Sequence, residues 1–235
     1  ARFANPTGAA RTAMAEPVLF DVSGEGVATI TLNRPERLNA INIEMRDLLW
    51  TYFQAVRDMP GLHALVFRGE GTAFSAGADI SEFGTSPSIM DARRARHDRD
   101  LWWLLLNLQV PTIARMHGFC FGAGLELPLL CDYRIAAEGT TVALPEVTLG
   151  YIPSACGTQT LQRIAGPGVA AGMILTGERV TAADALTWEI LDEVVPVDEL
   201  DAAIGRKLES FTSAEVAAAT MERRREMLAD NLTGE

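Results

Sequence analysis

The sequence predicts an α/β fold built around one continuous core. Short apolar segments typical of strands alternate with segments of helical period as far as about residue 145, and mostly helical segments follow. Glycine-rich loops join several strands to the helices after them. The chain has 235 residues, of which 48% are hydrophobic and 22% charged, and a chain of this size buries roughly 70% of its unfolded surface.

The first part of the chain predicts a hairpin and a helix. Residues 18–22 and 27–32 are apolar, β-rich segments on either side of the turn Ser23-Gly-Glu-Gly. Residues 33–37 form a loop that contains Pro35. Asn42 can cap a helix that ends before Pro60-Gly61. The helix has apolar residues at helical spacing, namely Met45, Leu48, Leu49, Phe53 and Val56.

The middle of the chain repeats the order of strand, glycine-containing loop and helix. Strands are expected at residues 64–68, 112–116, 133–137 and 141–144. The loop 74–80 follows the first of these, and a second glycine-rich turn at 117–124 leads into a helix at 125–130. We expect Pro128 near the start of that helix, where proline is tolerated.

Residues 84–100 are polar and predict a loop, followed by a helix through Trp102 and Leu105. The arginines in this segment are interleaved with aspartates, which favours a solvated face over a phosphate-binding one. These arginines are Arg93, Arg94, Arg96 and Arg99.

The last third predicts helices. They are expected between Pro153-Ser154 and Leu161, then at residues 169–175, 181–189 and 198–211, and finally from a Ser213 cap through Met227. We divide the chain into a tail at 1–16, a core at 17–212 and a C-terminal helical segment at 213–235. The tail has no apolar signal region, so we expect an expression tag or a disordered segment.

Charge and cysteine content exclude several classes of protein. The net charge of −11 argues against a nucleic-acid partner, which needs a basic footprint. No uncharged apolar run reaches the roughly 18 residues of a membrane span, so no membrane partner is expected. Cys120, Cys131 and Cys156 are too few and too widely spaced for a disulfide framework or a zinc site, which predicts reduced thiols in the cytoplasm.

Two kinds of residue in this sequence could carry chemistry. The glycine-rich loops at 74–80 and 117–124 could present backbone N–H groups as an oxyanion hole, although each loop alone is more typical of a tight turn. Glu126 and Glu146 interrupt apolar stretches, and an apolar pocket raises the pKa of a carboxyl group into a range useful for acid/base catalysis. The alternative is that Glu126 borders a helix end and Glu146 lies in a turn. The three histidines share no metal-binding spacing.

Four motifs together resemble the enoyl-CoA hydratase/isomerase (crotonase) superfamily. They are residues 33–41 (NRPERLNAI), 74–80 (FSAGADI), 117–127 (HGFCFGAGLEL) and 144–153 (LPEVTLGYIP). They occur in the family's order, and the resemblance runs from about residue 18 to about residue 212. It implies a crotonase-like spiral of repeated ββα units with C-terminal helices. It also implies an acyl-CoA thioester substrate and a homotrimer or dimer of trimers. No cofactor or metal is implied apart from the coenzyme A of the substrate.

The resemblance also implies roles for individual residues. The backbone N–H groups of Ala78 and Ala123 match the oxyanion-hole donors, although many relatives have glycine in place of Ala123. Glu126 and Glu146, twenty positions apart, match the two hydratase carboxylates. The coenzyme A segment matches Arg37, Leu38, Ala76, Ala78, Asp79 and Ile80. Arg37 and the arginines at 93–99 are the candidate cations for its phosphates.

We therefore predict a hydratase that adds water to a 2-enoyl-CoA to give a 3-hydroxyacyl-CoA. One alternative is an enoyl-CoA isomerase or another crotonase-type acyl-CoA lyase. An alternative of another class is a non-catalytic member that binds RNA or coenzyme A. The sequence departs from the family at Ser154, where hydratases usually have glycine, and at its end after Glu235, where the family typically continues with another helix. We therefore expect a truncated or disordered C-terminus. Candidate acyl-pocket residues are Phe83, Trp103, Phe121 and Ser154, with Trp102 and Phe119 as further apolar candidates.

Overall fold

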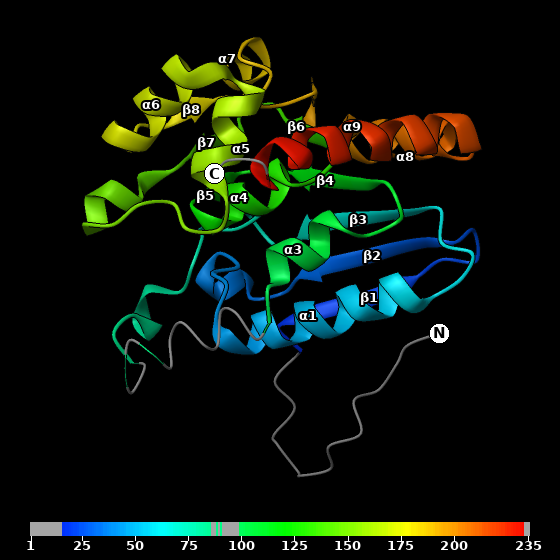
Figure 1. The fold of residues 1–235 in the computed structure, drawn as a ribbon, viewed down its shortest axis with the longest axis horizontal. Coiled ribbons are helices and arrows are strands. Elements are labelled where there is room, and N and C mark those ends of the chain that lie inside the picture. The colour runs from blue at the N-terminus through cyan, green and yellow to red at the C-terminus, as the bar shows by residue number, and fades with distance from the viewer. Residues whose placement is uncertain (1–15, 86–87, 89, 91–98, 233–235) are drawn as a thin grey trace.

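The computed structural model describes residues 16–85, 88, 90 and 99–232 and confirms the α/β class (Figure 1). A six-stranded sheet has the order β1-β2-β3-β4-β6-β9, and a three-stranded sheet has the order β5-β7-β8. The strands of the larger sheet are β1 (Val18–Val22), β2 (Val27–Leu32), β3 (Ala64–Gly69), β4 (Thr112–Met116), β6 (Tyr133–Ala137) and β9 (Glu193–Val195). Those of the smaller sheet are β5 (Phe119–Phe121), β7 (Thr141–Ala143) and β8 (Val180–Thr181).

Helices surround these sheets and make up most of the C-terminal third. The α-helices are α1 (Ile43–Asp58), α3 (Leu101–Leu106), α4 (Ala123–Leu129), α5 (Gly157–Ile164), α6 (Gly166–Thr176), α7 (Ala182–Thr187), α8 (Leu200–Phe211) and α9 (Ala214–Leu232). Short 3₁₀ helices are η1 (Pro35–Arg37), η2 (Ile80–Glu82), η3 (Pro145–Leu149) and η4 (Val197–Glu199). Within the described ranges, no helix has both the length and the apolar character to cross a lipid bilayer.

The large sheet is buried on both faces, which explains the continuous apolar run in β3. Successive side chains of a strand point to opposite faces. Leu65 and Phe67 belong to a core cluster shared with α1, whereas Ala64 and Val66 belong to a second cluster shared with α8. Figure 1 accordingly shows α1 beside β1 and β2, and α8 beside β4. After the antiparallel β1-β2 hairpin, the strand pairs of this sheet are parallel, as expected for a sheet covered on two sides.

The helix predicted after Asn42 is confirmed with its cap. The Asn42 side chain accepts a hydrogen bond from the Met45 N–H at 2.9 Å, which satisfies one of the unpaired donors at the start of the helix. The helix buries Met45, Leu49, Phe53 and Val56, while Leu48 is only half-buried. Phe53 packs edge-on against Phe67 with ring centres 5.7 Å apart, so α1 is fixed to the sheet.

The structure corrects the prediction for residues 117–124, because Phe119–Phe121 form a strand rather than part of a turn. This strand, β5, pairs with β7 in the register Cys120↔Val142. An isolated bridge between Ser75 and Cys120 also sets the loop after β3 beside β5. A three-residue strand between glycines has no periodicity to reveal it, and its partners lie elsewhere in the chain.

The helix α4 also differs from its prediction. It starts at Ala123, two residues earlier than predicted, so Pro128 lies one residue before its end rather than near its start. The buried residues of α4 include Leu125, Leu127 and Leu129. A proline near the end of so short a helix removes few backbone hydrogen bonds, and the packing of the buried side chains stabilises the helix.

The predicted C-terminal helices are confirmed with shifted ends. The helices predicted at 169–175, 181–189 and 198–211 correspond to α6, α7 and α8, and the short strands β8 and β9 between them were missed. Ser213 Oγ accepts from the Val216 N–H at 3.4 Å at the start of α9, which extends beyond the predicted Met227. The residues 1–15 of the predicted tail and Arg93, Arg94 and Arg96 lie outside the described residues.

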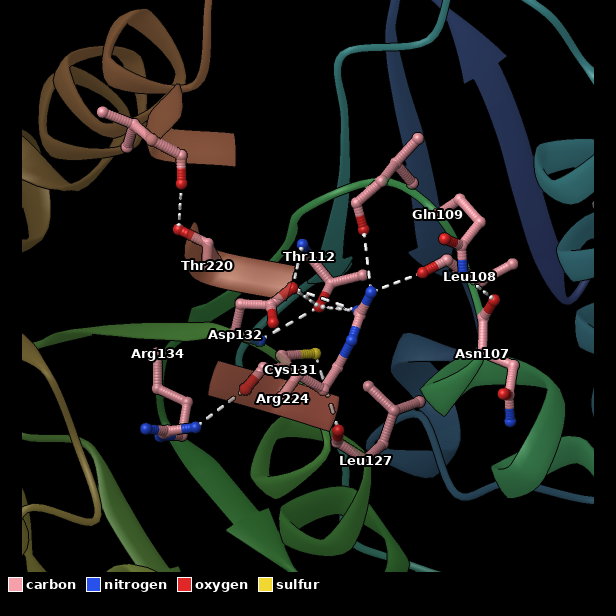
Figure 2. Close-up of polar contacts among 12 residues, drawn as sticks. Asn107, Leu108, Gln109, Thr112, Leu127, Cys131, Asp132, Arg134, Thr220 and Arg224 are labelled. Carbon is pink, nitrogen blue, oxygen red and sulfur yellow. Dashed lines mark hydrogen bonds and ion pairs between the residues drawn. The ribbon is translucent and has the colours of Figure 1, made fainter. Parts of the chain in front are cut away.

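A buried arginine fixes α9 to the core (Figure 2). Arg224 is 4% exposed, and its guanidinium lies 3.1 Å from an Asp132 carboxylate oxygen and also donates to the Leu108 carbonyl. Asp132 in turn accepts from the N–H and hydroxyl of Thr112, both at 2.8 Å. The last helix is therefore held by polar contacts to the segment between α3 and β4 and to the start of β6.

Candidate active site

A cavity of about 260 Å³ brings together the four residues predicted to carry catalysis. Its walls come from α1, α3, α4, η3 and the loops before η2 and α5. The lining residues are Ile41, Arg46, Ala78, Trp102, Ala123, Glu126, Glu146, Tyr151, Ser154 and Ala155. The cavity thus joins segments that are far apart in the sequence.

Backbone pairing directs the Ala78 N–H away from its neighbouring strand segment. Ile41 donates to the Gly77 carbonyl at 2.7 Å and accepts from the Asp79 N–H at 3.0 Å. In a parallel bridge of this kind, the residue between the two bonded groups points its own N–H to the other side. The Ala78 N–H therefore faces away from Ile41.

A second bridge, between Ser75 and Cys120, brings the segment of Ala123 close to that of Ala78. Ser75 bridges Cys120, and Ala78 and Ala123 each follow their bridged residue by three positions. Ala123 is the first residue of α4, so its N–H has no acceptor within the helix and carries part of the positive helix dipole. Two backbone donors thus lie in adjacent segments at the wall of one cavity.

Close contact between these segments requires glycine. Gly77 has φ +102°, and a Cβ atom there would lie 2.7 Å from the Phe121 carbonyl oxygen. Gly122 has φ +51°, and a Cβ atom there would lie 3.1 Å from a Glu146 carboxylate oxygen. Glycine is therefore needed at both positions, because each has a positive φ and leaves little room for a side chain beside the neighbouring segment.

Glu126 is buried and held by backbone donors. It is 2% exposed, and its Oε1 accepts hydrogen bonds from the N–H groups of Ala155 and Gly157, both at 2.8 Å. Because Gly157 begins α5, the carboxylate lies at the positive end of that helix, which stabilises its negative charge. Glu126 itself lies in the first turn of α4. The alternative prediction that this residue borders a helix end therefore agrees with its position in the structure.

Glu146 has a different environment. It is 4% exposed, and its Oε2 atom has no hydrogen-bond partner among the residues that the structure describes. Burial raises the pKa of Glu146 above the ordinary value of 4.5. A carboxyl group that keeps its proton at higher pH is suited to donate it during a reaction.

Comparison with known proteins decides the family. A model of the enoyl-CoA hydratase/isomerase family matches residues 23–233. The chain belongs to this family. A Mycobacterium bovis relative named as a probable enoyl-CoA hydratase is 37% identical over 174 residues, which are 74% of this chain and 67% of the relative. A crotonyl-CoA hydratase of Syntrophomonas wolfei is 36% identical over 182 residues, covering 75% of this chain and 68% of the relative.

Solved structures of the enoyl-CoA hydratase/isomerase family agree with the fold. An enoyl-CoA hydratase of Mycobacterium smegmatis has a TM-score of 0.81 and 28% identity, and the match covers 93% of this chain and 91% of that one. A Thermobifida fusca protein in complex with CoA has a TM-score of 0.82 and 28% identity, covering 92% and 86%. The predicted crotonase-like fold is therefore confirmed.

A backbone hydrogen bond joins the two segments predicted to bind coenzyme A. The Ala76 N–H donates to the Leu38 carbonyl at 2.8 Å, which joins the segment 37–38 to the segment 76–80. Arg37, Leu38 and Ile80 are exposed. The Asp79 carboxylate instead bonds Ser81 and lies 3.0 Å from an Arg34 nitrogen, and these contacts lower its pKa. Asp79 thus fixes the loop through its side chain.

The acyl-pocket candidates have separate positions. Ser154 lines the cavity, and Phe83 packs edge-on against the cavity residue Tyr151 at 5.3 Å between ring centres. Trp102 borders the cavity, whereas Trp103 is 58% exposed and is not among the described lining residues. Phe121 is not among them either.

Phe121 packs elsewhere, against Phe119 and beneath the Arg179 guanidinium. Trp102 and Trp103 are adjacent, and only the orientation of α3 decides which of them faces the cavity.

Sequence reasoning missed Ile41, Arg46, Tyr151 and Ala155 as lining residues. Ile41 and Tyr151 lie inside the quoted family motifs and could have been included on that ground. Arg46 lies on the polar side of an amphipathic helix, where a solvated side chain is the usual expectation. In the described part of the chain, no cluster of three or more His, Cys, Asp or Glu side chains could hold a metal.

Proposed function

We propose that this protein is an enoyl-CoA hydratase that converts a 2-enoyl-CoA into a 3-hydroxyacyl-CoA. The observation that carries the proposal is the pairing of two buried glutamates, Glu126 and Glu146, with two backbone donors on one small cavity. Membership of the enoyl-CoA hydratase/isomerase family and relatives named as hydratases support it.

The backbone donors act on the thioester carbonyl. In the proposed reaction this oxygen lies between the N–H groups of Ala78 and Ala123 and gains negative charge as water adds to the double bond. Each preorganised donor contributes about 2.7–4 kcal/mol to transition-state stabilisation in comparable oxyanion holes. The N-terminus of α4 adds a favourable potential without adding formal charge.

The two glutamates divide the proton transfers. The Glu126 carboxylate orients a water and accepts its proton while the oxygen attacks Cβ. Glu146, whose pKa is raised by burial, donates a proton to Cα. The different environments of the two carboxyl groups support opposite roles, since Glu126 has two backbone donors and one Glu146 oxygen has no hydrogen-bond partner in the described part of the chain.

The remaining substrate contacts are also proposals. The surface of Arg37, Leu38, Ala76, Asp79 and Ile80 holds the coenzyme A portion, with Arg37 as a cation for its phosphates. Arg99 is the one member of the predicted arginine cluster within the described ranges, and it pairs with Asp47 at 2.6 Å. Addition of water changes no net oxidation state and uses protein carboxylates, so the proposed step needs neither a redox cofactor nor a metal.

We also propose a homotrimer or dimer of trimers in the cytoplasm, as the family resemblance implies. The structure places none of Cys120, Cys131 and Cys156 in a disulfide within the described residues, which is typical of a reducing compartment. Size-exclusion chromatography with light scattering measures the assembly, and a monomer at micromolar concentration would contradict it.

The test is a steady-state assay of crotonyl-CoA hydration. We expect loss of the enoyl thioester absorbance and formation of 3-hydroxybutyryl-CoA. A 3-enoyl-CoA is assayed in parallel, and turnover of that substrate without hydration of crotonyl-CoA would identify an isomerase instead. Salt-sensitive retention of RNA with neither activity would favour a non-catalytic binding protein.

A further inference from the structure

One cation borders the cavity and has no role in the proposed water addition. Arg46 lies in the first part of α1, is half-buried, and lines the same cavity as Glu126 and Glu146. Its cavity neighbours include the apolar side chains of Ile41 and Trp102. A guanidinium ion in such surroundings loses hydration, and this loss is costly unless an anion pairs with it.

No protein acid neutralises Arg46 across residues 16–85 and 99–232, where no ion pair or side-chain hydrogen bond involves it. The adjacent Asp47 pairs with Arg99 at 2.6 Å. Glu82 accepts a hydrogen bond from the Ile43 N–H at 2.9 Å. Asp47 and Glu82, two acids close to the start of α1, therefore have partners other than Arg46.

The two glutamates on the cavity do not pair with the Arg46 guanidinium either. Neither Glu126 nor Glu146 forms an ion pair with Arg46 in the described structure. The Glu126 Oε1 atom is occupied by two backbone donors. The pKa of Glu146 is raised by its burial, the opposite of what a close cation would cause.

We propose that Arg46 binds a carboxylate carried by the acyl chain, so that the preferred substrate is a short 2-enoyl-CoA with a second, terminal carboxyl group. This inference rests on the proposed function. The thioester and the double bond are uncharged, so a simple hydrocarbon acyl group would leave the guanidinium unpaired. A terminal carboxylate accepts two parallel hydrogen bonds from arginine.

The size of the cavity sets the length of the acyl group. At about 260 Å³ it lies below the range of about 300–1,000 Å³ for typical ligand pockets. It shares its walls with the proposed oxyanion donors, so the group that reaches Arg46 belongs to the acyl end of the substrate. The coenzyme A surface is formed by other residues.

Binding of unreactive thioesters tests this inference independently of catalysis. Dissociation constants are measured by calorimetry for matched saturated pairs of four, five and six carbons: succinyl-CoA against butyryl-CoA, glutaryl-CoA against valeryl-CoA, and adipyl-CoA against hexanoyl-CoA. We expect the wild-type protein to bind the dicarboxylic member of at least one pair about tenfold or more tightly, the effect of a charged hydrogen-bonded contact.

Three variants make the result specific to Arg46. Arg46→Met keeps a long side chain without charge and is expected to bring the ratio of the two dissociation constants within each pair to about one. Arg46→Lys is expected to keep part of the preference for the dicarboxylic thioester, because lysine supplies charge without the bidentate geometry. Arg57→Met, on the same helix but at an exposed ion pair with Asp58, is the control and is expected to keep the full preference.

Equal affinities within all three wild-type pairs, or a preference that survives in Arg46→Met, would overturn the inference. Failure of the proposed function gives a different result. In that case crotonyl-CoA is not hydrated, while the carboxylate preference at Arg46 can still be measured in the binding assay.

Discussion

The N–H of Gly157 donates a hydrogen bond of 2.8 Å to Oε1 of Glu126, and a Cβ atom added to Gly157 would lie 2.8 Å from that same oxygen. The start of α5 therefore both holds this carboxylate and leaves no room for a side chain beside it. Gly157 was not among the residues that the sequence motifs identified. Its role follows from the packing of α5 on α4, which brings the two residues together.

Replacing Gly157 with alanine is expected to displace Glu126 from its position on the cavity. A displacement of about 1 Å in a catalytic group costs about 100-fold in rate, so kcat for crotonyl-CoA hydration should fall by about that factor. The measurement is steady-state kinetics, together with a melting temperature to show that the variant is folded.

Gly168→Ala is the matched control for this change. Gly168 lies in α6 and has no atom within 4 Å of an added Cβ. Alanine there is expected to leave kcat unchanged and to raise stability by about 0.4–1 kcal/mol. Equal activity of the two variants would contradict the positioning role of Gly157.

Glu146→Gln is expected to lower kcat by at least about 100-fold, the low end of general acid/base contributions. The amide has nearly the same shape but cannot donate a proton to Cα. Glu138→Gln changes an exposed glutamate and is the control for the loss of one charge. A hydration rate near that of the wild type would remove Glu146 from the mechanism.

Glu126→Gln tests the second carboxylate separately. The amide oxygen can still accept the bonds from Ala155 and Gly157, so the geometry is preserved while the charge is lost. We expect hydration to fall by about 100-fold or more, because water loses its base. Any isomerase activity on a 3-enoyl-CoA should be spared. Equal loss of both activities would show that Glu126 is not specific to water addition, and that it either supports the fold or is needed for both reactions.

The pH dependence of hydration should report the protonated form of Glu146. Burial raises the pKa of Glu146, so its protonated form persists above pH 4.5. Hydration needs this proton, so its kcat/KM should fall as the pH rises through the raised pKa. Dehydration should show the same limb in kcat/KM, because the reaction exchanges no net proton and its equilibrium constant does not depend on pH. Rate profiles measured in both directions test this, and a hydration kcat/KM that stays level as the pH rises would contradict the assignment.

The pair of Arg224 and Asp132 should control the stability of the C-terminal helix. Arg224→Met leaves the buried Asp132 carboxylate without its ion-pair partner, and breaking a buried pair in this way typically costs about 3–5 kcal/mol. We expect a lower melting temperature and faster proteolysis within α9. The double variant Arg224→Met with Asp132→Asn removes both charges and should recover part of the loss. A stability like that of the single variant would argue against charge burial as its cause.

Local sequence signals predicted much of the fold. The strands at 112–116 and 133–137, the Asn42 cap and the Ser213 cap were visible because each depends on neighbouring residues. β5 and the start of α4 were not visible. Their backbone bonds run to Ser75, β7 and other distant segments, so local composition carries no signal for them.

In the candidate site, too, some residues could be predicted from the sequence and others only from the fold. Glu126, Glu146, Ala78 and Ala123 could be named from motifs whose spacing repeats in a family, and all four line one cavity. Trp102 was separated from Trp103 only by the rotation of α3 against α1. Asp79 was predicted only as a member of the coenzyme A segment, and the pairing of its side chain with Arg34 and Ser81 came from the fold.

By itself the sequence determined the fold class, the family and the identity of the four residues on which the proposed chemistry depends. The fold class follows from short-range sequence patterns, and the family and the four residues follow from motifs that occur in the family's order. Only the tertiary structure decided that Arg224 is buried, that Arg46 borders the cavity with no ion pair to an acid of the described residues, and that Glu126 and Glu146 have opposite environments. Burial and hydrogen bonding depend on segments distant in the chain, and a charged residue in a helical sequence has the same local signature whether it ends in solvent, in a cavity or in the core.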